Sequence, residues 1–227
     1  MTAAQKAYMA IAKGLSINEA ERCIVMQGFY EQLEIAQQSQ YAQETSIKAK
    51  LYDIIEDNSL DEDEKQSLKK PLISELEEIE NKHIRIRRSV LIGLYSFWEV
   101  SLKAILSSQS FISPHSNKGN RQIERNSKKS KAWNYLKQIY GEDIPNTSLL
   151  IDDAIRECRN YIVHGQLSSN QEETIRTLEV SNPEFCIGIT CGNCVITHYS
   201  GLRHLLEYIS RELDNAELAA KKQHNQF

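Results

Sequence analysis

The chain has 227 residues with 27 Lys or Arg, 31 Asp or Glu and a formal net charge of −4. Its nine glycines and four prolines are about half the usual share, which favours long helices and excludes collagen-like chains, Gly/Pro-rich disorder and turn-rich β-sandwiches. The mild acidity argues against a protein that coats nucleic acid through bulk charge, but it leaves room for a local basic site.

Signals for export or membrane insertion are lacking in this sequence. The first residues have no continuous apolar core of the signal-peptide kind, neither end has a lipidation motif, and the most apolar stretch, residues 89–98, is too short to span a bilayer. Five cysteines, an odd number in a chain that needs no disulfides, indicate a reducing compartment. We therefore expect a cytoplasmic protein with no membrane contact.

Helical patterns cover residues 2 to about 56. An acidic stretch follows, because residues 53–82 hold eleven carboxylates against four lysines. A short helix in this stretch is expected to stop before Pro71, since the residue preceding a proline avoids the helical conformation. The acidic run is typical of a solvated helical face, and the alternative is a surface that faces a partner or inhibits the protein itself by mimicking phosphates.

A long helix is expected from about residue 72 to residue 108. Its second half is apolar nearly all round, which predicts a central place in the fold. Residues 113–131 indicate a loop with six basic residues against one glutamate, a net charge of +5. Helices are then expected over residues 131–140 and over residues 147–164, each ending at a glycine.

One strand signal precedes the last helix. Residues 185–190 and 194–198 flank Gly192-Asn193, a pair that favours a two-residue hairpin turn. A final amphipathic helix is expected from about residue 199 to residue 221.

The densest polar cluster within an apolar helix lies at residues 156–165. Asn160 and His164 are four residues apart and share a helix face, with Arg159 displaced by about 100°. Gly165 is placed to close the helix in the left-handed conformation, so the last carbonyls favour the imidazolium form of His164. This set suits proton transfer on an anionic substrate, although the same residues are also ordinary at a helix C-terminus.

Two carboxylates before this cluster indicate which of its arginines is available to bind an anionic substrate. Asp152 and Asp153 lie four and three residues before Arg156, the spacing at which helical side chains form ion pairs. We therefore expect Arg156 to be paired and Arg159 to remain available.

The end of this helix resembles the signature of the HEPN superfamily (higher eukaryotes and prokaryotes nucleotide-binding domains), in which an arginine, usually followed by a polar residue, precedes a histidine by a short spacer. Here the run is Arg159-Asn160-Tyr161-Ile162-Val163-His164-Gly165, with a spacer of four residues. Phe97-Trp98-Glu99 is similar to an aromatic-then-acid element of an early apolar helix in that family. The resemblance covers roughly residues 84–213.

The resemblance implies an all-α fold, in agreement with the periodicities. We expect a HEPN-like helical bundle over residues 84–227, an N-terminal helical extension with the acidic segment over residues 1–83, and one small β-hairpin before the last helix.

The activity that the resemblance implies is that of an endoribonuclease needing neither metal nor cofactor, with a symmetric dimer bringing two motifs into one composite site. The motif places Arg159, Asn160 and His164 there as catalytic residues. The histidine would move the proton of the 2′-hydroxyl or of the leaving oxygen, and the arginine would stabilise the charge on the phosphorane, yielding a 2′,3′-cyclic phosphate.

Members of this family often act as toxins or in phage defence, so an antitoxin or regulatory protein is an expected partner. Two rival hypotheses stay open. One is a non-catalytic HEPN module that binds nucleotide or RNA, or serves as a scaffold for a partner. The other is a helical adaptor whose motif is incidental and whose acidic N-terminal segment is its interaction surface.

Glu99 is the expected supporting residue of the site. A carboxylate among aromatic side chains is costly to bury alone, so it should find a cation. It either orients Arg159 in the cleft or pairs with Lys103 four residues later.

The basic loop is the candidate RNA-binding segment, because local positive charge supplies much of non-specific affinity. Trp133 and Tyr135 follow it and could stack on bases; the alternative is a solvated loop followed by core aromatics. Its basic residues are Lys118, Arg121, Arg125, Lys128, Lys129 and Lys131.

The cysteines do not predict a metal site. Cys191 and Cys194 have the C-x-x-C spacing, but a second pair for structural zinc and a βαβ pattern for a thioredoxin-like site are both lacking. Cys23 and Cys158 are interpreted as small core residues.

Overall fold

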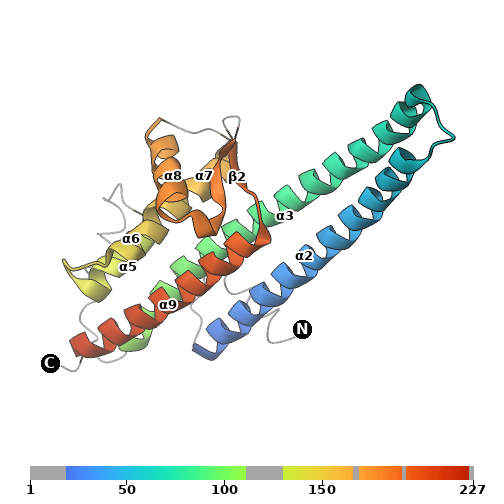
Figure 1. Cartoon of the computed structure of the whole chain (residues 1–227). Coiled ribbons are helices and arrows are strands. Elements are labelled where there is room, and N and C mark those ends of the chain that lie inside the picture. Colours follow the sequence, from blue (N-terminus) through green and yellow to red (C-terminus); the bar gives the residue numbers. More distant parts are fainter. Residues whose placement is uncertain (1–18, 111–129, 166–168, 191–192, 225–227) are drawn as a thin grey trace.

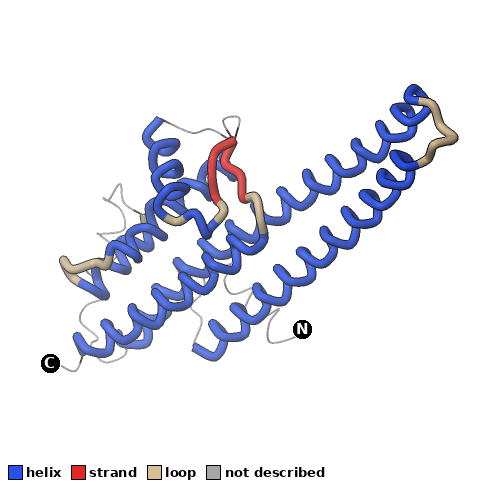
Figure 2. The backbone as a smooth tube through the Cα atoms, viewed as in Figure 1, coloured by secondary structure: helices blue, strands red, loops and turns tan. Residues whose placement is uncertain are grey.

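The computed structural model describes residues 19–110, 130–165, 169–190 and 193–224. It confirms an all-α fold with an N-terminal helical extension and a small β-hairpin before the last helix (Figures 1 and 2). The elements, in chain order, are α2 (Glu19–Glu56), α3 (Glu62–Ser110), α5 (Lys131–Tyr140), α6 (Asn146–Leu150), the π-helix η1 (Ile151–Ile155), α7 (Arg156–His164), α8 (Ser169–Ser181), the 3₁₀ helix η2 (Pro183–Phe185), β1 (Ile187–Thr190), β2 (Asn193–Ile196) and α9 (Tyr199–His224).

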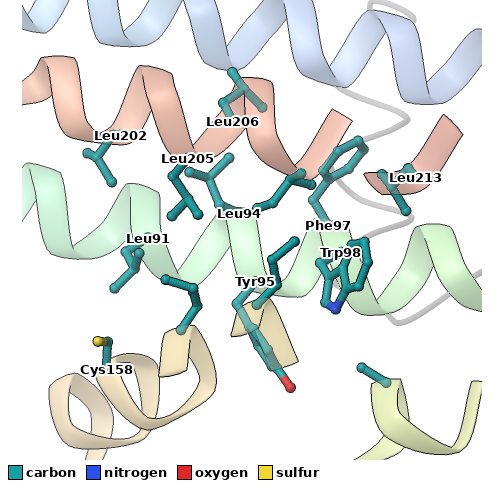
Figure 3. Packing of buried hydrophobic residues seen from close by; sticks show 14 of the residues in the cluster. Leu91, Leu94, Tyr95, Phe97, Trp98, Cys158, Leu202, Leu205, Leu206 and Leu213 are labelled. Carbon is teal, nitrogen blue, oxygen red and sulfur yellow. The ribbon is translucent and has the colours of Figure 1, made fainter. Parts of the chain in front are cut away.

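The second half of α3 is the centre of the core, as its all-round apolar pattern predicts. Leu91, Leu94, Phe97 and Trp98 are completely buried. Figure 3 shows the leucines of α9 lying along α3, with Cys158 of α7 on another side. Burial of each such side chain stabilises the fold by roughly 1.5–3 kcal/mol. The packed pair of α3 and α9 therefore stabilises the helices that pack on it.

By length and composition alone, one 18-residue stretch within Glu62–Ser108 would pass as a membrane span. In this structure 61% of that stretch is buried inside the protein, and the core helix of a soluble protein passes the same test.

The N-terminal extension is an antiparallel pair formed by α2 and the first half of α3, and it reaches well beyond the remaining helices (Figure 1). The first half of α2 joins the common core through Val25, Phe29 and Leu33, and Arg22 forms an ion pair with Glu217 of α9. The division expected after residue 83 lies inside α3, which runs without interruption from extension to core.

The expected break before Pro71 is wrong, because α3 continues through this proline. Pro71 and Ser67, whose carbonyl the proline leaves without a helical donor, are both exposed, so water can take that place. The N-terminus of α3 is also stabilised by side-chain caps. Asp61 Oδ1 accepts from the Glu64 amide at 2.8 Å, and Glu64 Oε2 accepts from the Asp61 amide at 3.0 Å, a reciprocal capping box.

The β-hairpin is present, but its turn lies one residue earlier than expected. The register pairs Ile187 with Ile196 and Thr190 with Asn193, so Asn193 belongs to the strand. The two residues that connect the strands, 191 and 192, lie outside the described residues. Residue 185 is in η2 rather than in a strand, and Cys186 turns the chain into β1 with a left-handed φ of 52°.

Helix α8 is an element that the sequence patterns missed. Ser169 and Glu172 have the spacing of a capping box, and Ile175 and Leu178 are completely buried three residues apart. Those two signals would have been enough to propose the helix.

The two cysteines interpreted as core residues differ. Cys158 is buried, as expected, whereas Cys23 is exposed, which corrects that interpretation. Cys191 lies outside the described residues. Within the described ranges, His, Cys, Asp and Glu side chains form no group of three or more that could hold a metal ion.

Candidate functional site

The motif sits at the end of a helical run from residue 146 to residue 164, made of α6, η1 and α7. Its beginning is held by Glu212 of α9, which accepts from Thr147 Oγ1 at 2.8 Å and Ser148 Oγ at 3.0 Å. Its end is closed by Gly165, which has a left-handed φ of 73° and donates its amide to the Tyr161 carbonyl at 2.7 Å. His164 therefore has a defined position in the last turn.

A π-helical turn, Ile151–Ile155, directly precedes α7, the helix that carries the motif. Such a turn accommodates one extra residue and changes the direction in which the following side chains point; π turns recur at functional sites. Here it carries Asp152, whose side chain is completely buried.

Asp152 is the centre of a buried polar cluster, and it precedes the motif in the same helical run. It accepts from Ser130 Oγ at 2.5 and 2.6 Å and from the Tyr95 hydroxyl at 3.1 Å. The same Ser130 Oγ caps α5 by accepting from the Trp133 amide at 2.8 Å. Burial raises the pKa of Asp152, which the hydrogen bond from Ser130 and the charge of Arg156 partly oppose.

Arg156 is paired, as its spacing from the two aspartates predicts. Its guanidinium lies 3.8 Å from Asp152 Oδ2, 3.4 Å from Asp153 Oδ1 and 3.1 Å from Glu157 Oε1. Three carboxylates thus surround one cation, and little of its charge remains for a ligand.

Arg159 has different surroundings. It is half-buried, and its Nη1 donates to Asn160 Oδ1 at 3.0 Å. Within the described part of the chain, no carboxylate oxygen lies within 4 Å of its guanidinium. Asn160 is half-buried as well, and His164 is exposed. The structure therefore presents an arginine held by a neutral amide, five residues before an accessible imidazole on the same helix.

Glu99 of α3 lies in the electrostatic field of this cluster. Burial raises the pKa of its carboxyl, Lys131 and Arg159 lower it, and Asp152 raises it further. Lys131 is the cation that lowers the pKa of Glu99 most, ahead of Arg159 and Arg156, so three cations act on this carboxyl. Its role in orienting Arg159 stays a prediction.

Of the expected RNA-binding residues, only Lys131 is within the described ranges. It is the exposed first residue of α5. Trp133 is half-buried with Lys137 Nζ 5.7 Å from its ring centre, and Tyr135 packs against the core. The other candidates, Lys118, Arg121, Arg125, Lys128 and Lys129, lie outside the described residues.

Sequence reasoning missed two members of this site, Ser130 and Tyr95. The position of Ser130 immediately before a helix is a signal for a capping residue. Tyr95 precedes Glu99 by one helical turn, which places both on one face of α3. Nothing in the local sequence connects either of them to Asp152.

The comparisons with known proteins leave the family open. No protein-family model matches this chain, and neither the curated proteins nor the solved structures contain a significant match.

Proposed function

We propose that the protein is a metal-independent endoribonuclease of the HEPN type, with Arg159, Asn160 and His164 as its catalytic residues. The observation that carries the proposal is the contrast between two neighbouring arginines. Arg156 is surrounded by three carboxylates, whereas Arg159 is held by the side-chain amide of Asn160, and His164 is exposed in the last turn of the same helix. An anionic phosphate would therefore find its positive partner at Arg159.

The proposed reaction uses the nucleophile that RNA itself carries. His164 removes the proton of a 2′-hydroxyl or donates one to the leaving 5′-oxygen, and Arg159 stabilises the charge on the phosphorane oxygens. Asn160 fixes the Arg159 side chain through the 3.0 Å hydrogen bond, so the guanidinium is oriented before substrate arrives. The product is a 2′,3′-cyclic phosphate and a 5′-hydroxyl.

One copy of the motif supplies one histidine, while the reaction needs a base and an acid. We therefore propose that two chains pair symmetrically, with both motifs facing one cleft. The same proposal includes a cytoplasmic role as a toxin or phage-defence effector, held in check by an antitoxin or regulatory protein.

The test is cleavage of total RNA by the purified protein in EDTA. Wild type should cleave, and Arg159→Ala and His164→Ala should each lose at least about a hundredfold in rate, the usual contribution of such groups. Arg176→Ala and His204→Ala are matched controls, because both side chains are exposed and lie on α8 and α9.

Three results would count against the proposal. Full cleavage by Arg159→Ala and His164→Ala would place the activity elsewhere, and equal losses in the controls would point to general damage. Absence of cleavage by wild type, with RNA or nucleotide still bound, would favour the non-catalytic module.

A further inference from the structure

The N-terminal extension is joined to the start of α9 by a buried histidine, His83 of α3. Its side chain is only 1% exposed. The Nδ1 atom lies 2.7 Å from the hydroxyl oxygen of Tyr199, the first residue of α9, and the two rings meet edge to face with 5.8 Å between their centres. The link from β2 to α9 passes along α3 here (Figures 1 and 2). His83 therefore helps to hold the start of α9 against the extension.

A second contact holds the same link. Arg87, one helical turn after His83, is also 1% exposed. Its Nε donates to the Ile196 carbonyl at 2.6 Å, and its guanidinium carbon lies 5.4 Å from the centre of the Tyr199 ring. Two positions of the link, Ile196 and Tyr199, thus depend on two neighbouring side chains of α3.

The neutral imidazole of His83 fits this place, and the protonated form does not. Nδ1 has its partner in the Tyr199 hydroxyl, whereas Nε2 is buried and has no hydrogen-bond partner among the residues that the structure describes. A neutral imidazole carries one N–H, which Nδ1 can donate to Tyr199, while an imidazolium carries an N–H on both nitrogens. Protonation would therefore leave a charged donor buried without an acceptor, which is costly.

The positive groups that face His83 make a further positive charge there unfavourable. Lys82 and Arg87 lie near it on α3, and the amino end of α9 adds a partial positive charge at Tyr199. Burial lowers the pKa of His83, and the charges of Lys82 and Arg87 lower it further.

The negative groups that face His83 do not offset this. Glu80 of α3 and Glu44 of α2 raise the pKa of His83, but by less than burial and the cations lower it. Each of these carboxylates already has its own cation. Glu80 Oε1 lies 2.5 Å from Arg87 Nη2. Glu44 Oε2 lies 2.8 Å from Lys48 Nζ. Within the described part of the chain, His83 is thus a buried base without a counter-ion of its own.

We propose that His83 is a proton-operated joint: when it takes up a proton, the link between β2 and α9 separates from α3 and His83 becomes exposed. An open groove of about 800 Å³ borders this link, and water can enter there because Ile196, Tyr199 and Arg87 line it. β2 also packs against α7, so the joint connects the extension with the helix that carries the motif. The proposal does not depend on the ribonuclease activity.

The ordinary pKa of histidine sets the size of the effect. An exposed histidine has a pKa of about 6.5, so the ratio of opened to closed form rises about 30-fold between about pH 7.5 and about pH 5 when the closed form stays neutral. Hydrogen–deuterium exchange followed by mass spectrometry measures this opening. After correction for the intrinsic pH dependence of exchange, the amides of residues 196–203 should exchange at least about tenfold faster at the lower pH, and those of α5 should not.

Substitutions of single histidines identify the group that takes up the proton. His83→Gln stays neutral and keeps a polar atom for the Tyr199 hydroxyl, so it should abolish the acceleration. His198→Gln and His204→Gln are matched controls, because both side chains are exposed, one directly before Tyr199 in the chain and the other on α9. Both controls should retain the acceleration.

The wild-type measurement needs no variant, since equal exchange at the two pH values would overturn the proposal. An acceleration that persists in His83→Gln, or that disappears in His198→Gln, would assign the effect to another group. An equal acceleration in α5 would indicate general loosening in acid and would also overturn the proposal. Where His83→Gln does not fold, NMR titration of wild type decides: the imidazole in contact with the Tyr199 ring should titrate below about pH 6.5, and titration at or above that value contradicts the joint.

Discussion

Two substitutions of Asp152 should distinguish what its hydrogen bonds contribute to the free energy of unfolding from what its charge contributes. Asp152→Ala leaves the Tyr95 hydroxyl and Ser130 Oγ without their acceptor. A buried polar group without a partner costs about 1–3 kcal/mol, and Ser130 retains its bond from the Trp133 amide, so we expect a loss of about 2–4 kcal/mol in the free energy of unfolding. Asp152→Asn keeps one oxygen of the same shape for the two hydroxyls. Burial disfavours the charged form, so this variant should lose less than about 1.5 kcal/mol.

Urea unfolding followed by circular dichroism measures both variants, with Asp153→Ala as the control. Asp153 is half exposed and contributes only one of the contacts to Arg156, so its removal should change stability by less than about 0.5 kcal/mol. Equal losses for Asp152→Ala and Asp152→Asn would refute the argument, because they would show that the charge, and not the acceptor, holds the cluster together.

Other predictions concern backbone contacts and pH. In Gly201→Ala the new methyl carbon would lie 2.0 Å from the Phe185 carbonyl oxygen, so we expect a loss of more than about 2 kcal/mol by urea unfolding. Gly188→Ala would meet only the movable end of Glu179, and should cost about 1 kcal/mol or less; equal costs would contradict this account. Burial raises the pKa of both Glu99 and Asp152, so the folded state takes up their protons at higher pH than the unfolded chain. Their contribution to stability is therefore fully present below the ordinary carboxyl pKa values of about 4, and it is lost as pH rises through the raised folded pKa values. Unfolding at several pH values should show a flatter dependence in Glu99→Gln/Asp152→Asn, and an unchanged slope would contradict the assignment.

The parts of the fold that the sequence predicted are those with strong local signals. The helix over residues 131–140 has the expected bounds, because Ser130 caps its start and Gly141 ends it with a positive φ of 66°. The apolar half of α3 is central because no polar face interrupts it. The helix end predicted before Pro71 is wrong. The effect of a proline on a helix depends on whether water reaches the carbonyl that it leaves without a donor, and the local sequence does not reveal whether water reaches it.

For the candidate site, the sequence predicted the pairing of Arg156 and the closure of the helix at Gly165. It could not predict the π turn, because one extra residue in a helix leaves the pattern of apolar positions nearly unchanged. Nor could it bring Tyr95 and Ser130 to Asp152, since these contacts span 57 and 22 residues of chain and depend on how the helices pack.

The chemical form of the RNA ends tests the central claim most directly. RNA incubated with wild-type protein in EDTA should acquire 2′,3′-cyclic phosphate and 5′-hydroxyl ends, and His164→Ala should form neither above background. Products with 3′-hydroxyl ends, or cyclic phosphates formed equally by His164→Ala, would contradict the assignment of Arg159 and His164 as the catalytic pair.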